Sequence, residues 1–571
     1  MQIQSEHIEI VERGHGLPTS PDPPPARFHW AKAIVALLAV NMVAYAQIVS
    51  IIGSGLLATQ TTAYLGDTSK AGWLSTILTI FTLALNPIVS QAADYWGRKS
   101  FIIVFSVVGG FAGPMIISRA NSVTTLISGF CVLGLAFGSQ ALTFTVASEV
   151  IPRRYRAVGQ ATLTASSALG GISATLAGSA LIAHSENYRT FWYIVAGLYL
   201  FGALGVAVGY NPPPRLLERS LRQRQKLACL DWMGTALLTA GLTLFCVALQ
   251  WSGNPYSWSD PHILAPFILA VTLLLLFIAY ERRFKKDGIL HHGLFQHRNL
   301  LIGLVAMFIE GVSFFSYNSY YVLEVHTLTD STMFSAGLQF TILFFSATVA
   351  SVLVAIYTSW TRQLRETLLF GFACFVTFNA LMASVTAHSH PAVFWTYPTI
   401  GGAGLGTLVT NLAVIMQMST PSELISITTG ILTATRSLGG TVGLAVNHAI
   451  LSNTLSARLG PAVASAVLPL GFPPNEVGAL ISALEGGGGD LSGFAAEEVI
   501  LTPQMVKSAV AARKGAYVVA FRNVWISAAA FSFAGLCLAC FIKNMRAEFT
   551  DHVDAPVVED EDERVTTGIK E

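Results

Sequence analysis

Two ionisable residues lie in the middle of long apolar stretches and are the first candidates for chemistry. Glu310 is surrounded by Met, Phe, Ile, Gly and Val, and Arg436 by Ala, Thr, Ser and Leu. A charged side chain at the centre of a membrane helix costs about 2.5–3.5 kcal/mol on insertion scales unless it is paired or hydrated. A carboxyl group at this depth can bind and release a proton near neutral pH. We expect Glu310 to couple a proton to movement, with Arg436 as its partner or as a contact for an anionic ligand; a static structural pair is the alternative.

Three charged residues near the ends of apolar stretches form a second candidate group. Asp94 and Arg98 belong to the segment Asp-Tyr-Trp-Gly-Arg-Lys, and Glu149 follows another apolar stretch. Gly97 permits a tight turn, and the basic residues hold such a loop at one face of a membrane. Asp94 can pair with a helix N-terminus or with a nearby arginine. We expect Glu149 to join Asp94 in a gating network; the alternative is a surface ion pair worth under about 1 kcal/mol.

Aromatic and amide side chains gather in apolar stretches from both halves of the chain. Aromatic rings with a few amides suit a bulky, partly apolar ligand that needs orienting hydrogen bonds. Each single aromatic residue is also a candidate for packing or for contact with lipid. The predicted ligand contacts are Gln47, Gln140, Phe314, Tyr317, Asn318, Tyr321, Gln339 and Phe344.

The composition indicates which elements carry these residues. Of the 571 residues, 11% are charged and 53% are hydrophobic, whereas soluble proteins have about 25% charged residues. This excludes a set of soluble domains and predicts an all-α polytopic membrane protein embedded in a lipid bilayer. The formal net charge is +1. No nucleic-acid partner is expected, because binding phosphates needs clustered Lys and Arg on a solvated face.

Hydropathy windows predict fourteen transmembrane helices, arranged as six, two and six. Basic residues gather in alternate short loops, for example at 98–99, 153–156 and 215–226. Because positive loops stay on the cytoplasmic side, both termini are predicted to be cytoplasmic. The predicted spans are 32–57, 72–93, 101–119, 123–147, 157–183, 190–209, 232–252, 262–280, 299–323, 333–358, 366–387, 393–418, 426–451 and 522–543.

The same pattern divides the chain into five regions. Basic loops at matching positions of the first and last six helices favour two related halves around a site at the membrane midplane. Short helices and a glycine joint are expected in the one long loop, on the extracytoplasmic side. The regions are a disordered cytoplasmic tail (1–30), a six-helix bundle (31–209), basic loops with two linker helices (210–298), a second six-helix bundle (299–543) including the long loop (455–520), and an acidic cytoplasmic tail (544–571).

The segment from Asp94 to Lys99 resembles the signature loop of the major facilitator superfamily, which joins the second and third helices. In that family the loop latches the two halves together in one conformation, so the resemblance implies a gating role for Asp94 and Arg98. The chain has Ser90 where the family usually has glycine at a close helix approach. Fourteen spans and the segment Ser148–Arg156 resemble the drug:proton antiporter branch and its fungal group of trichothecene efflux pumps and siderophore transporters. The motifs at 230–232 and 254–258 add to this likeness.

Two departures from the antiporter pattern affect the predicted direction of transport. The first helix has Ala46–Val49 where drug antiporters of this branch usually carry an aspartate, and the fifth lacks their Gly-Pro motif. The resemblance implies a secondary active transporter that works by alternating access, with proton-coupled efflux of a bulky toxin or other secondary metabolite. Proton-coupled uptake of ferric siderophores is the alternative, which the missing Gly-Pro motif favours.

Other classes of protein find little support in the sequence. There is no P-loop, no His-Glu-x-x-His and no Gly-x-Ser-x-Gly elbow, so neither ATP drive nor an enzyme is expected. A membrane-embedded enzyme or a nutrient receptor remains the alternative class. No metal or cofactor is expected, and the proton gradient is the expected driving force. The resemblance implies a monomer in the plasma membrane, with a vesicular or vacuolar membrane as the alternative.

Overall fold

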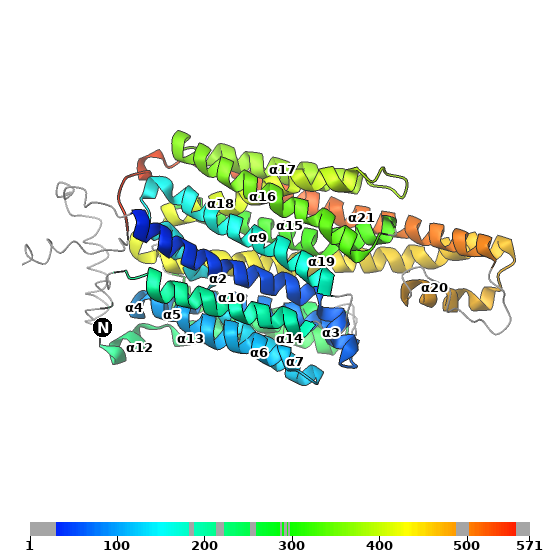
Figure 1. Cartoon of the computed structure of the whole chain (residues 1–571), viewed down its shortest axis with the longest axis horizontal. Coiled ribbons are helices and arrows are strands. Elements are labelled where there is room, and N and C mark those ends of the chain that lie inside the picture. The colour runs from blue at the N-terminus through cyan, green and yellow to red at the C-terminus, as the bar shows by residue number, and fades with distance from the viewer. Residues whose placement is uncertain are drawn as a thin grey trace, which may run out of the picture.

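The computed structural model consists of long helices that run alongside one another (Figure 1). It describes residues 30–554 apart from 182–187, 213–217, 219–221, 252–257, 286–287, 291–293, 295–296, 330 and 487–501. Residues 1–29 and 555–571, which hold most of the two predicted tails, lie outside the described residues. The described residues contain no β-strand, and twelve helices among them are long and apolar enough to cross a membrane. The predicted all-α polytopic fold class is confirmed.

The predicted number of spans is matched in part. Helices α9 (Arg156–Leu181) and α19 (Ile425–Val467) are long enough to cross a membrane but are not among the twelve. Both contain many Gly, Ser and Thr residues, which lower their hydropathy. Including them would give fourteen spans, and that number stays a prediction.

The first half of the chain forms helices α2 to α10, with breaks inside two of the predicted spans. The span predicted at 123–147 is divided at Gly138 and Ser139, and the span at 101–119 contains a π-helical turn at Ser106–Phe111. The helices of this half are α2 (Trp30–Leu56), α3 (Ala58–Tyr64), α4 (Ala71–Trp96), α5 (Arg98–Phe105), α6 (Ala112–Ser118), α7 (Val123–Phe137), α8 (Gln140–Glu149), α9 and α10 (Tyr188–Gly209).

The second half follows a short linker region of three described helices. The linker helices are α12 (Gln223–Cys229), α13 (Trp232–Trp251) and α14 (Pro261–Arg283). The helices of the second half are α15 (Arg298–Thr329), α16 (Met333–Thr361), α17 (Arg365–Ala383), α18 (Val393–Met418), α19, α20 (Val477–Gly486) and α21 (Pro503–Ala539).

The segment predicted as a long loop at 455–520 is mostly helical, which corrects that prediction. Helix α19 continues to Val467 and α21 begins at Pro503, so both extend beyond the other helices, with α20 beside them (Figure 1). Hydropathy marks where a helix leaves the bilayer and not where it ends. The extension is held by its own buried cluster instead, whose members include Leu459, Val463, Val467, Phe472, Leu480, Leu484, Met505 and Ala509.

The two halves meet mainly along three of their helix pairs. Helix α9 packs against α16 and α18, and α4 packs against α19. The linker helices α13 and α14 pack on each other, and α13 also packs on α4. The interface between the halves therefore contains α9 and α19, two long helices rich in small and hydroxyl side chains, which allow backbones to approach closely.

Candidate functional site

Glu310 on α15 and Arg436 on α19 form a two-point ion pair. The Arg436 Nε atom donates to Glu310 Oε2 at 2.6 Å, and Nη2 donates to Oε1 at 2.9 Å. The Glu310 side chain is fully buried, whereas the Arg436 side chain is 17% exposed. The Phe314 ring lies over the guanidinium, 4.7 Å from its central carbon to the ring centroid. Planar two-point pairing of this kind is the strong form of an arginine–carboxylate interaction.

The pair lies deep in the helical array. Glu310 is twelve residues after the start of α15 and Arg436 eleven after the start of α19. At about 1.5 Å per residue, both lie about 16–18 Å from those starts, near the middle of a hydrocarbon core about 30 Å thick. The helices approach closely there because Gly311 faces the backbone carbonyl of Arg436, where a side chain would collide.

Two small cavities next to the pair are lined by helices of both halves. Their volumes are about 50 and 30 Å³, far below the roughly 300–1,000 Å³ of sites that hold drug-sized ligands. In this conformation the halves enclose the central space almost completely. The residues shared by the two linings are Ile48, Gln140, Phe144, Phe314 and Arg436.

The predicted ligand contacts divide into two groups. The larger cavity is lined by Gln47, Gln140, Phe314 and Phe344, together with Arg436. The other four predicted contacts line neither cavity, and three of them are buried elsewhere in the second half. Tyr317 accepts a hydrogen bond from Asn379, the Tyr321 hydroxyl donates to the Phe394 carbonyl, Gln339 is buried, and Asn318 is half-buried. Their roles stay predictions.

The break between α7 and α8 positions the two glutamines of the cavity. The Gln47 amide donates to the Ala136 carbonyl at 3.1 Å, and the same carbonyl accepts from the Ser139 hydroxyl at 2.9 Å. The Asn86 side-chain oxygen, Oδ1, accepts from the Ala141 N–H at 3.1 Å, at the start of α8. Side chains thus replace helix hydrogen bonds on both sides of the break, as buried backbone groups require. Gln140, the first residue of α8, lies at the cavity as a result.

The three charged residues of the predicted gating group lie together in the first half. Arg98 contacts Asp94, with 3.2 Å between Nη2 and Oδ1, and pairs with Glu149 through its other terminal nitrogen. Glu149 is fully buried, so it is not a surface pair. Gly97 has φ +83°, a value that suits glycine and turns the chain between α4 and α5. The signature loop, α5 and the end of α8 are therefore joined by one buried charge network.

Helices α4 and α19 approach closely at Ser90, although the residue is not glycine. Gly430 on α19 provides the space, since a Cβ atom there would lie 2.6 Å from the Ser90 hydroxyl oxygen and 2.8 Å from the Asn86 carbonyl oxygen. Gly430 on the facing helix therefore leaves room for the Ser90 side chain. The close approach of the two halves is retained.

Polar side chains along one face of α9 connect it to α18. The Gln160 amide donates to the Gln417 side chain at 3.2 Å, and the Thr164 and Thr410 hydroxyls are 3.1 Å apart. The Gln417 amide also donates to Thr429 on α19 at 3.2 Å. Gln417 is fully buried and was not predicted, although an amide at the end of the apolar run Leu-Ala-Val-Ile-Met is a visible signal. These bonds fasten the halves together between the cavity and the starts of α9 and α19.

A segment after α21, residues 546–554, lies on the loop between α8 and α9. We call it the C-terminal strap. The backbone N–H groups of Arg153 and Arg154 donate to the carbonyls of His552 and Thr550, at 3.0 and 2.9 Å. The Asp554 carboxylate pairs with Arg153 and Arg156.

The strap connects the two halves at the membrane face that carries the Asp94–Lys99 loop, which we call the basic face. Burial alone would raise the pKa of the Asp554 carboxyl, but the charges of Arg156 and Arg153 outweigh it and hold that pKa below its usual value. Asp554 is therefore ionised when docked. The strap belongs to the predicted acidic tail (544–571).

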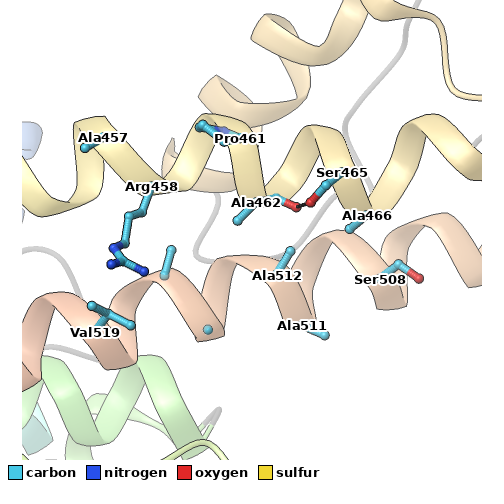
Figure 2. A pocket seen from close by; sticks show the side chains of 12 residues that line it. Ala457, Arg458, Pro461, Ala462, Ser465, Ala466, Ser508, Ala511, Ala512 and Val519 are labelled. Carbon is cyan, nitrogen blue, oxygen red and sulfur yellow. Dashed lines mark hydrogen bonds between the residues drawn. The ribbon is translucent and has the colours of Figure 1, made fainter.

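A larger groove of about 710 Å³ lies outside this site, between the extended ends of α19 and α21 (Figure 2). Its walls are mostly alanine and serine, and Arg458 is the only charged residue among its twelve lining residues. Small side chains with one cation offer little to orient a ligand. We assign no site to this groove.

Membrane-length helices thus form two connected groups, with small cavities between them and a buried ion pair in the second group. The chain belongs to the Major Facilitator Superfamily, whose family model matches residues 34–444. The predicted family is confirmed, and the chain is a multi-pass membrane transporter.

Comparisons with individual proteins agree with this family. The chain is 26% identical over 430 residues to the MFS-type transporter ucsD of an Acremonium species, covering 74% of this chain and 71% of that one. It is 23% identical over 507 residues to the trichothecene efflux pump TRI12 of Trichoderma arundinaceum, covering 86% and 82%. These relatives are transporters and not enzymes.

Among solved structures, the chain is similar to the human organic anion transporter MFSD10 (TETRAN). The TM-score is 0.52 at 11% sequence identity, covering 90% of this chain and all of the other. At this identity the likeness concerns the fold alone.

Proposed function

We propose that the protein exports a bulky, partly apolar organic compound, such as a fungal toxin or other secondary metabolite, in exchange for protons. The observation that carries the proposal is the Glu310–Arg436 pair beside a cavity that both halves line. We place the protein in the plasma membrane as a monomer, with the basic face and both termini in the cytoplasm. A vesicular or vacuolar membrane is the alternative location.

A proton on Glu310 would change the wall of the cavity. Protonation removes the negative charge that holds Arg436 and weakens a charge-assisted, two-point hydrogen bond. The Arg436 side chain and the Phe314 ring over it would then be free to rearrange. Because a proton and a ligand would act on the same wall, their binding would be linked, as coupled transport requires.

The lining of the cavity supports the class of compound. Phe144, Phe314 and Phe344 provide apolar surface, and Gln47 and Gln140 provide hydrogen-bonding groups. The cavity is too small for such a compound in this conformation, so the halves must separate to admit it. The bonds of Gln417 and the C-terminal strap are the contacts that would open when the cavity faces the cytoplasm.

The direction of transport is supported by similarity to proteins named as efflux pumps. The test is a mass-spectrometric comparison of medium and cell contents between the native host and a strain lacking this protein, grown with little iron. A compound that disappears from the medium and accumulates in the cells, and returns to the medium on re-expression, supports export. A ferric chelate that remains in the medium of iron-starved cells contradicts export and supports siderophore uptake instead.

A further inference from the structure

A second carboxyl group is buried in the same half as Glu310 and has no role in the mechanism above. Glu324 lies fourteen residues after Glu310 on α15 and is 1% exposed. The Trp525 indole N–H on α21 donates to its Oε2 atom at 2.6 Å. Among the described residues, no Lys, Arg or His forms an ion pair with Glu324. A buried carboxylate without a cation is far more costly than a buried neutral carboxyl.

The helices around Glu324 offer few compensating charges. Neither α16 nor α18 contains Asp, Glu, Lys, Arg or His. On α19 and α21 the residues nearest to this level are His448 and Arg522, and both are exposed. His326 on α15 itself contacts the Ser331 carbonyl, at 2.6 Å from Nδ1. The environment of Glu324 is therefore set by burial and by one neutral donor.

A line of buried polar groups lies between the two carboxyl groups. Ser313, one turn from Glu310, is 3.1 Å from the Ser532 hydroxyl. The Asn379 amide donates to Ser532 at 3.0 Å and to the Tyr317 hydroxyl at 3.1 Å. These bonds join α15, α17 and α21 inside the second half.

The line continues toward Glu324 from Tyr317. The contact on this side is between rings and is not a hydrogen bond: the Tyr317 ring lies beside Trp525, with 6.0 Å between ring centroids, and the Trp525 indole N–H donates to Glu324. Glu310, Tyr317 and Glu324 are spaced by seven residues, which places them along one side of α15, about 10 Å apart at each step. Glu310, Tyr317 and Glu324 thus lie on the same side of α15.

One polar atom on this line is buried without a partner. The Asn379 side-chain oxygen has no hydrogen-bond partner, although Asn379 is fully buried. A buried, unpaired oxygen among hydroxyl groups is a place where an internal water is stabilised. Water there would extend the line of exchangeable protons.

We propose that Glu324 is a second proton-binding carboxyl, and that internal water completes a route from it to Glu310 along the polar groups of Tyr317, Asn379, Ser532 and Ser313. This proposal rests on the proposed function, in which Glu310 binds the coupled proton. Glu324 lies farther from the basic face than Glu310 and would receive protons from the opposite side of the membrane. Proton delivery would then occur through the interior of the second half, separate from the ligand cavity.

Infrared difference spectroscopy of the purified full-length protein tests the protonation of Glu324 without a ligand. The variant Glu324→Gln keeps an acceptor for the Trp525 indole, and Glu310→Gln is the matched control. We expect a protonated-carboxyl band that disappears as pH is raised, is missing in Glu324→Gln and remains in Glu310→Gln. Trp525→Phe should shift the pH at which the band disappears. A spectrum of Glu324→Gln identical to wild type at every pH would overturn the proposal.

Transport measurements test the connection to Glu310. With the compound identified by the secretion comparison, Asn379→Leu and Glu324→Gln should lower flux driven by a pH gradient about 100-fold, the loss of a proton-transfer group. Substrate exchange at equal pH should stay near wild type. An unchanged ratio of driven flux to exchange overturns the connection. Absence of gradient-driven flux in the wild type would instead contradict the proposed function. The infrared band would in that case still show that Glu324 binds a proton, so the two failures are distinguishable.

Discussion

Arg436 donates two hydrogen bonds to Glu310, 2.6 and 2.9 Å long, where α15 and α19 cross near the middle of the membrane. The two partners differ in exposure: the Glu310 carboxylate is fully buried, whereas the Arg436 guanidinium is partly exposed. Glu310 faces the interior of the second half, and Arg436 reaches the cavity. In the proposed function, the pair would therefore join the site of proton binding to the wall of the ligand cavity.

The ion pair makes a prediction about stability. Removing one partner leaves the other charge buried and unpaired, so Glu310→Gln or Arg436→Gln should each lower the free energy of unfolding by about 3–5 kcal/mol. The double variant should recover most of this loss, because no uncompensated charge remains. Thermal unfolding of the purified variants in detergent checks this. Single variants as stable as wild type would show that the pair is hydrated and not buried.

The approach of α4 and α19 makes a second prediction. Gly430→Ala places a methyl group 2.6 Å from the Ser90 hydroxyl oxygen, and overpacking of this kind costs about 1–3 kcal/mol. Transport should fall while Ser90→Gly alone has little effect. The pair Ser90→Gly with Gly430→Ala should recover part of the loss, because the Asn86 carbonyl still limits the space. Equal transport by Gly430→Ala and wild type would mean that the halves do not need this contact.

The docking of the C-terminal strap should depend on pH in one direction. The docked Asp554 carboxyl has a lowered pKa, so its contribution is complete above the usual carboxyl pKa of about 3.9. It is lost only as pH falls below that value through the lowered pKa. The amides of Arg153 and Arg154, which donate to the strap, should therefore stay protected from hydrogen exchange between about pH 5 and 8.

Two substitutions separate the contribution of the Asp554 carboxylate from that of the rest of the C-terminal strap. Asp554→Asn should reduce the protection of the Arg153 and Arg154 amides at every pH in that range. Asp551→Asn is the control, because the Asp551 side chain is 75% exposed and, among the described residues, forms an ion pair only with the half-exposed Arg154. Protection that disappears near neutral pH in the wild type would contradict the assignment.

Two of the three glutamines among the predicted ligand contacts, Gln140 and Gln339, allow a matched test of the ligand site. Gln140 lines both cavities, whereas Gln339 is buried and lines neither. Loss of one hydrogen bond, about 1 kcal/mol, should raise the KM of transport about fivefold in Gln140→Ala. Gln339→Ala should leave KM unchanged. A raised KM in Gln339→Ala alone would move the ligand site toward the interior of the second half.

Hydropathy predicted the fold well where helices lie in lipid and poorly beyond it. Spans such as 393–418 coincide with the observed α18 because the bilayer sets the length of an apolar run. The extension of α19 to Val467 was missed because its polar residues mark the exit from the membrane, while the helix is continued by packing against α20 and α21. Packing between segments distant in sequence has no signal in a hydropathy window.

The candidate site was predictable in its charges and less so in its contacts. Glu310 and Arg436 stood out because a charge in an apolar stretch is unusual, and the structure pairs them. An aromatic residue in an apolar stretch does not indicate whether it faces the cavity or the interior of a bundle. Phe314 lines the cavity, whereas Tyr317, three residues later, accepts a hydrogen bond from Asn379 inside the second half. Glu324 was missed because the predicted span ended at residue 323, one position earlier, whereas α15 continues to Thr329.

The central claim is that a proton on Glu310 drives export, and one flux measurement tests it most directly. Inside-out plasma-membrane vesicles with an acidic interior should accumulate the compound identified by the secretion comparison, and a protonophore should abolish this accumulation. Vesicles with equal amounts of the Glu310→Gln variant should show exchange of the compound at equal pH but no accumulation driven by the gradient. Accumulation by Glu310→Gln at the wild-type rate would contradict the claim.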